Sequence, residues 1–81
     1  MDELEKELRK IVSSVAKIPP DGFSVQDDLV TKFGVDSMQR IEMVIEMEKK
    51  FDITIPDDEA SRLRSLLDFV NLIQKRKAVH K

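Results

Sequence analysis

The sequence predicts an all-α fold, a bundle of four helices in which the third is short and a long loop joins the first two. Leu, Ile, Glu and Lys are frequent, and the chain holds only two glycines. Apolar residues recur at spacings of three and four, whereas β-branched and aromatic residues are too scattered to form alternating strands. A chain of 81 residues fits one domain, residues 1–81, because it is too short for a second core.

The first helix is predicted over residues 4–16. Its apolar side chains repeat every three or four positions and form one stripe: Leu4, Leu8, Ile11, Val12, Val15 and Ala16. Pro19 and Pro20 follow, and the residue before a proline is pushed out of helical conformation, so the chain turns here. A long loop is then expected over residues 18–35. It contains four apolar residues that can anchor it on the bundle: Phe23, Val25, Leu29 and Phe33.

Start signals mark the other three helices. Asp36 is a strong N-cap type ahead of a second helix predicted over residues 37–51. Pro56 opens the short third helix, and Ser65 with Asp68 makes a capping box at the start of the fourth. The fourth helix ends in three basic residues, which the helix dipole favours at that end: Lys75, Arg76 and Lys77.

The second helix has two apolar faces. One faces the core and consists of Met43, Val44, Met47 and Phe51. The other lies on a different side and consists of Met38, Ile41 and Ile45. In a small bundle each helix should turn one face to solvent, so this second face is either covered by the long loop or exposed to bind a partner. Its charged border, which includes Glu42 and Glu48, favours a partner.

Charge and composition disfavour several classes of protein. The 14 basic and 16 acidic residues give a net charge of -2, which does not suit a nucleic-acid binder. No apolar run approaches the ~20 residues of a membrane span, and the start of the chain is too charged for a secretory signal, so we expect a cytoplasmic protein. We expect a monomer because the second apolar face of the second helix is small and suited to transient docking. Without cysteine there is no thiolate metal site, and residues 52–59 lack the ligand pattern of a calcium loop.

Ser37 stands in the first turn of the second helix, but it lacks the partners of a catalytic serine. The single histidine is His80, near the end of the chain, and no Gly-x-Ser-x-Gly elbow surrounds Ser37. We therefore expect no enzyme. The first backbone amides of a helix have no internal acceptor and the dipole favours an anion there, so the position suits a phosphate group.

The segment Gly34-Val35-Asp36-Ser37-Met38 resembles the attachment motif of acyl carrier proteins. Residues 51–60 are also similar to the connector that leads into this family's short third helix. Apolar residues stand eight and four positions before the serine, as in the family: Leu29 and Phe33. The resemblance covers nearly the whole chain and implies the four-helix carrier-protein bundle, with no catalysis by the chain itself.

The resemblance implies a covalent cofactor and a set of partners. Ser37, after Asp36, would carry 4′-phosphopantetheine, moved there from coenzyme A by a phosphopantetheinyl transferase. Acyl groups would then travel as thioesters between acyltransferase, synthase or ligase enzymes. The face that meets these enzymes would comprise Met38, Ile41, Glu42, Ile45 and Glu48. The acyl chain is expected to enter the bundle interior at Met43, Val44, Met47 and Phe51, with Leu72 and Ile73 as neighbours.

The charge of the second helix departs from the family pattern. Carriers for bulk fatty-acid synthesis have a strongly acidic second helix, whereas here Arg40, Lys49 and Lys50 oppose four carboxylates. This balance favours a dedicated set of partners over the general fatty-acid enzymes. Two alternatives stay open: an aminoacyl carrier of the D-alanyl type, and an unmodified helical module that binds a partner through its exposed apolar face.

Overall fold

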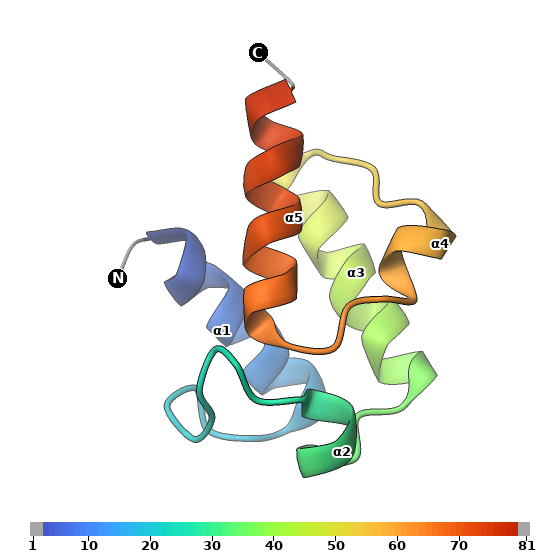
Figure 1. Cartoon of the computed structure of the whole chain (residues 1–81). Helices are drawn as coiled ribbons and strands as arrows, with labels where there is room; N and C mark the ends of the chain where they lie inside the picture. Colours follow the sequence, from blue (N-terminus) through green and yellow to red (C-terminus); the bar gives the residue numbers. More distant parts are fainter. Residues whose placement is uncertain (1–2, 80–81) are drawn as a thin grey trace.

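Residues 3–79 are described from a computed structural model, with side chains up to residue 76. The all-α prediction is confirmed (Figure 1): all regular elements in this range are helices. The first, α1 (Glu3–Ala16), packs against α3 (Ser37–Phe51) and α5 (Leu66–Val79). It ends where predicted, before the two prolines, because Lys17 adopts a left-handed conformation with φ of 60°.

The loop after α1 differs from the prediction in one element, because it contains a short helix. This helix, α2 (Leu29–Phe33), was expected to be part of an irregular loop. Asp28 caps its start, and Gly34 ends it with φ of 71°, a left-handed conformation that glycine adopts without a Cβ clash. The predicted anchors hold the loop, since Phe23 and Leu29 are buried.

The next helix, α3 (Ser37–Phe51), has the predicted bounds, and Asp52 closes it in a left-handed conformation. After an extended stretch, α4 (Asp57–Ala60) follows Pro56, which is the N-cap residue rather than the first helical residue as expected. The last helix, α5 (Leu66–Val79), begins with the predicted capping box. In that box Asp68 N–H donates to Ser65 Oγ, and Ser65 N–H donates to Asp68 Oδ2.

The core lies between α1, α3 and α5, and loop residues close its ends. Its side chains are apolar, and each is at most 7% exposed: Leu8, Val12, Phe23, Leu29, Val35, Met43, Val44, Met47, Ile55, Leu63, Leu66, Phe69, Val70 and Ile73. Arg9 ties the long loop to α1, because its Nη1 donates to the backbone oxygens of Pro20 and Phe23 at 2.7 Å. Among the described residues, no helix is long and apolar enough to cross a membrane.

Candidate functional site

Ser37 is the first residue of α3, and its side chain is exposed. A reciprocal capping box fixes the backbone around it. Asp36 Oδ1 accepts from the N–H of Gln39 at 2.8 Å, and Gln39 Oε1 accepts from the N–H of Asp36 at 3.2 Å. The predicted N-cap role of Asp36 is thereby confirmed. Ser37 thus lies at a helix start whose backbone is held by two reciprocal hydrogen bonds between Asp36 and Gln39.

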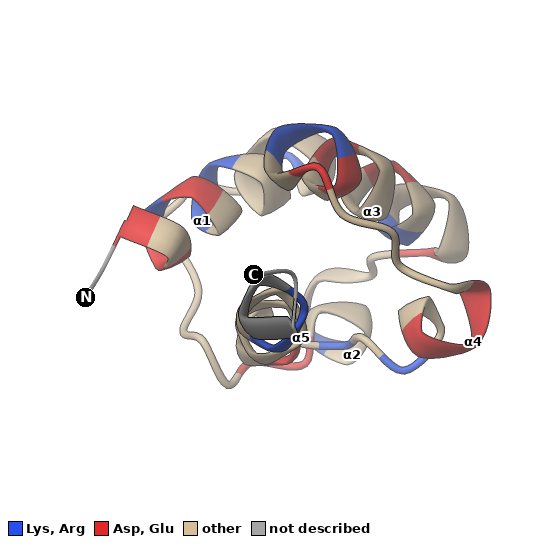
Figure 2. Ribbon diagram, turned by 90° about the horizontal axis from the view of Figure 1, so that it is seen from above, with Lys and Arg blue, Asp and Glu red and all other residues tan. Residues whose placement is uncertain are grey.

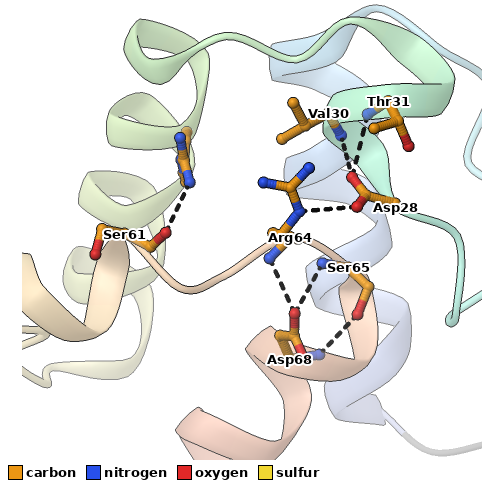
Figure 3. Close-up of polar contacts among 8 residues, drawn as sticks. Asp28, Val30, Thr31, Ser61, Arg64, Ser65 and Asp68 are labelled. Atoms are coloured by element: carbon orange, nitrogen blue, oxygen red, sulfur yellow. Dashed lines mark hydrogen bonds and ion pairs between the residues drawn. The ribbon is translucent and has the colours of Figure 1, made fainter.

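The segment that leads to Ser37 is held by Arg64, which lies just before α5 (Figure 3). Asp28 Oδ1 accepts from the N–H groups of Val30 and Thr31, at 2.9 and 3.1 Å. Its other oxygen pairs with Arg64 Nε at 2.8 Å, and the backbone oxygen of Arg64 accepts from Leu29 N–H. The hydrogen bond from Arg64, followed by those from the backbone, lowers the pKa of Asp28. Arg64 therefore positions α2, and α2 in turn positions the residues that join it to Ser37.

Beside Ser37 lies an apolar surface that we call the exposed stripe, made of Met38, Ile41 and Ile45. These side chains are 71%, 56% and 43% exposed, so the long loop does not cover them. The opposite face of α3 is buried as predicted, with Met43 and Met47 at most 1% exposed. Because burying apolar area is favourable, an uncovered stripe of this kind is suited to contact with another molecule.

The helix that bears the exposed stripe, α3, carries charges of both signs, as Figure 2 shows. Glu42 is exposed, whereas Glu48 is half-buried and its Oε2 accepts from the N–H of Ile55 at 2.7 Å. Lys50 pairs with Glu7 of α1 at 3.0 Å, and this hydrogen bond lowers the pKa of Glu7. Glu48 and Lys50 thus have structural roles within the chain.

A groove of about 450 Å³, the α3–α4 groove, opens directly beside Ser37. One wall comes from α3: Ser37, Arg40, Ile41, Val44, Ile45 and Glu48. The other wall comes from α4 and its flanks: Ile55, Asp57, Ala60 and Ser61. Its volume falls within the range of small-molecule sites, roughly 300 to 1,000 Å³, and most of its lining surface is apolar. A group attached to Ser37 would therefore find an apolar surface within reach.

The groove and the interior residues expected to receive an acyl chain overlap at one position, and the expectation itself stays a prediction. Of the four interior residues expected to receive an acyl chain, only Val44 lines the groove, while Met43 and Met47 pack in the core. The sequence reasoning also missed Arg40, whose Nη1 donates to the backbone oxygen of Ser61 at 3.0 Å. Arg40 stands three residues after Ser37, one helical turn away, and this spacing could have identified it as a neighbour of the serine.

No group of three or more His, Asp and Glu side chains within residues 3–76 is arranged to hold a metal ion. His80 lies outside the described residues. The exposed hydroxyl of Ser37, the capped helix start and the adjacent groove fit a covalently attached arm that carries a phosphate group and an apolar cargo.

Comparison with known proteins identifies the family. The family described as "Phosphopantetheine attachment site" matches residues 6–73. An acyl carrier protein of Campylobacter hominis is 35% identical over 72 residues, which cover 89% of this chain and 91% of the relative. An acyl carrier protein of Phenylobacterium zucineum is 33% identical, and the match covers 94% of this chain and 96% of the relative. One of Rickettsia bellii is 30% identical, and the match covers 96% of this chain and 91% of the relative.

The match thus takes in both the site and the bundle that supports it, from α1 to α5. The cofactor of such a chain is phosphopantetheine, and its role is to carry acyl groups rather than to catalyse a reaction. That role implies contact with acyl-handling enzymes and with a phosphopantetheinyl transferase. The chain belongs to the acyl carrier protein family.

Proposed function

We propose that Ser37 is the residue that carries the phosphopantetheine arm, with Asp36 as the residue that sets its geometry. The observation that carries this proposal is the position of the Ser37 hydroxyl: exposed, at the capped start of α3, and at one end of the α3–α4 groove. The chain has five other serines, of which Ser61 also lines the groove. Ser61 ends α4 and its hydroxyl donates to the backbone oxygen of Asp58, so it is a matched control.

The experiment is intact-protein mass spectrometry before and after incubation with coenzyme A and a broad-specificity phosphopantetheinyl transferase. We expect a gain of one phosphopantetheine unit in the wild type and in Ser61→Ala, and none in Ser37→Ala. A gain in Ser37→Ala would move the attachment site elsewhere. No gain in any variant, with several transferases, would favour the unmodified interaction module.

We further propose that the exposed stripe docks the enzymes that load and unload the arm. Met38, Ile41 and Ile45 supply an apolar centre, and Glu42 and Glu48 supply part of its charged border, which is the usual anatomy of an interface. Because Glu48 also accepts a hydrogen bond from Ile55, its substitution would disturb the chain as well as the interface. Glu42 is the cleaner residue to substitute.

The mixed charge of α3 supports a dedicated partner set over the general fatty-acid enzymes. Lys49 is exposed, and none of the ion pairs among the described residues involves it. Lys49→Glu should therefore raise turnover by general fatty-acid synthase enzymes, because complementary charge mainly sets encounter rate and partner choice. Lys50→Glu is a poorer test, since it also breaks the pair with Glu7. Unchanged turnover of Lys49→Glu would count against a dedicated set.

The cargo is proposed to be an acyl chain that rests in the α3–α4 groove. An acyl-loaded sample should show amide shifts at the groove residues Val44 and Ala60, compared with the unloaded arm. Shifts confined to Met43 and Met47 would instead support entry into the interior.

A single-domain chain acting as a cytoplasmic monomer completes the proposal. Size-exclusion chromatography with light scattering tests whether the chain is a monomer.

A further inference from the structure

Arg40 lies one helical turn after Ser37 and forms part of the wall of the α3–α4 groove. Residues three apart on a helix have Cβ atoms about 5–6 Å apart. Helical side chains also lean toward the start of their helix, so a long side chain at position 40 covers the turn that begins with Ser37. A group bonded to Ser37 Oγ is therefore within reach of the Arg40 guanidinium.

The hydrogen-bonding capacity of Arg40 is largely unused in the described part of the chain. Its Nη1 donates to the backbone oxygen of Ser61 at 3.0 Å. A guanidinium carries five N–H donors and a full positive charge. None of the ion pairs among residues 3–76 includes Arg40, although Asp57 lines the same groove. A cation with spare donors thus stands at the groove beside the proposed attachment residue.

We propose that Arg40 binds the phosphodiester group that joins the arm to Ser37, and that it gives up its hydrogen bond to Ser61 to do so. The inference rests on the proposed attachment at Ser37. In the hydrogen bond to Ser61 only the donor is charged, whereas a phosphodiester is an anion, and the guanidinium fork matches two of its oxygens at once. The backbone oxygen of Ser61 is a single uncharged acceptor, so the phosphodiester is the better partner.

Loading would then loosen one of the ties that hold α4. No residue of α4 is fully buried, and two arginines reach it from the neighbouring helices. Arg40 of α3 binds the Ser61 carbonyl at its end, and Arg76 of α5 pairs with Glu59. Transfer of Arg40 to the phosphodiester breaks the first tie and leaves the second. Attachment of the arm would therefore loosen the α4 wall of the groove, while the pair between Arg76 and Glu59 still holds it.

The test uses isotope-labelled full-length protein, with and without the arm, after intact mass has shown that the arm is on Ser37. On attachment, we expect the Arg40 Nε resonance and the Ser61 carbonyl ¹³C resonance to shift together. Loading the thiol with a straight-chain acyl group or with a dicarboxylic acyl group should add no comparable shift. A shift that appears only with the dicarboxylic group would assign the anion to the cargo and overturn the phosphodiester assignment.

Variants give an independent readout. The ³¹P resonance of the loaded protein should shift in Arg40→Gln, and added salt should move the wild-type resonance toward the Arg40→Gln position because salt screens the pair. Arg62→Gln is the matched control, since Arg62 follows Ser61 in the chain and is exposed but does not line the groove, and it should leave the ³¹P resonance unchanged. Identical ³¹P resonances in the wild type and Arg40→Gln would overturn the inference. If mass shows no arm on Ser37, the proposed function itself fails.

Discussion

Replacing one isoleucine of the exposed stripe and one of the core distinguishes a binding role from a role in stability. Ile41 is 56% exposed on α3, whereas Ile73 of α5 is 0% exposed. Full burial of an isoleucine side chain contributes about 1.5–3 kcal/mol, so the part of Ile41 that is covered contributes about 0.7–1.3 kcal/mol. Alanine retains some of this and has a higher helix propensity. Ile41→Ala should therefore lower the free energy of unfolding by less than about 1 kcal/mol, while Ile73→Ala should cost about 2–5 kcal/mol.

Urea unfolding followed by far-UV circular dichroism measures both costs. Where Ile73→Ala does not fold, Ile73→Val serves instead, with an expected cost of about 0.5–1.5 kcal/mol. The same proteins are then assayed with a phosphopantetheinyl transferase under native conditions. Ile41→Ala should lower kcat/KM by about fivefold or more, as truncation of a central interface residue does, and Ile73→Val should leave it near the wild-type value.

Two results would contradict this reasoning. Equal stability losses for Ile41→Ala and Ile73→Ala would mean that the exposed stripe is part of the folded core in solution. An unchanged kcat/KM for Ile41→Ala, with Met38→Ala also unchanged, would mean that enzymes dock elsewhere. Either result leaves the family assignment intact, because that assignment does not depend on the stripe.

Three further substitutions test the local structure around the site, each by urea unfolding. Asp36→Ala should cost about 1 kcal/mol through loss of the N-cap hydrogen bond to α3, whereas Asp36→Ser should retain most of it. Lys17→Gly should raise stability by about 0.5–1 kcal/mol, because Lys17 holds φ of 60° and glycine adopts this conformation without a Cβ clash. Asp28→Asn should keep the cap of α2 but remove the pair with Arg64, and so flatten the acid limb of the stability curve.

The sign of the pH effect follows from the lowered pKa of Asp28. Its ordinary value is 3.8, and the folded chain holds it lower through the Arg64 hydrogen bond. The stabilisation is therefore fully present above pH 3.8 and is lost as the pH falls through the lower, folded value. An acid limb as steep in Asp28→Asn as in the wild type would contradict this assignment. Equal stabilities of the Asp36→Ala and Asp36→Ser variants would contradict the N-cap prediction. A loss of stability in Lys17→Gly would contradict the prediction for Lys17.

The helices that could be predicted are those with strong local signals. The apolar stripe of α1 and the two apolar faces of α3 follow from spacing alone, and the exposure of Ile41 and Ile45 confirms that the second face is free. The short helix α2 was missed because its five residues are too few to show a period. Its caps, Asp28 and Gly34, were the available signals, but both residue types are also common in loops.

The α3–α4 groove could not be predicted, because it depends on contacts between residues far apart in the sequence. Arg40 and Ser61 are 21 positions apart, and no periodic pattern relates them. The groove also depends on Glu48, which fixes the stretch before α4 through the N–H of Ile55. Spacing identified the core face of α3 as the path for cargo, since it carries methionines. In the structure Met43 and Met47 are packed in the core, and the groove beside Ser37 reaches this face only at Val44; entry of cargo at the core face stays a prediction.

The attachment residue is tested most directly at the level of one peptide. Trypsin cleaves after Lys32 and Arg40, and residues 33–40 contain a single hydroxyl group, that of Ser37. After incubation with coenzyme A and transferase, tandem mass spectrometry should find one phosphopantetheine unit on this peptide and none on the peptides that contain Ser61 or Ser65. A modified protein whose 33–40 peptide stays unmodified would contradict the assignment of the arm to Ser37.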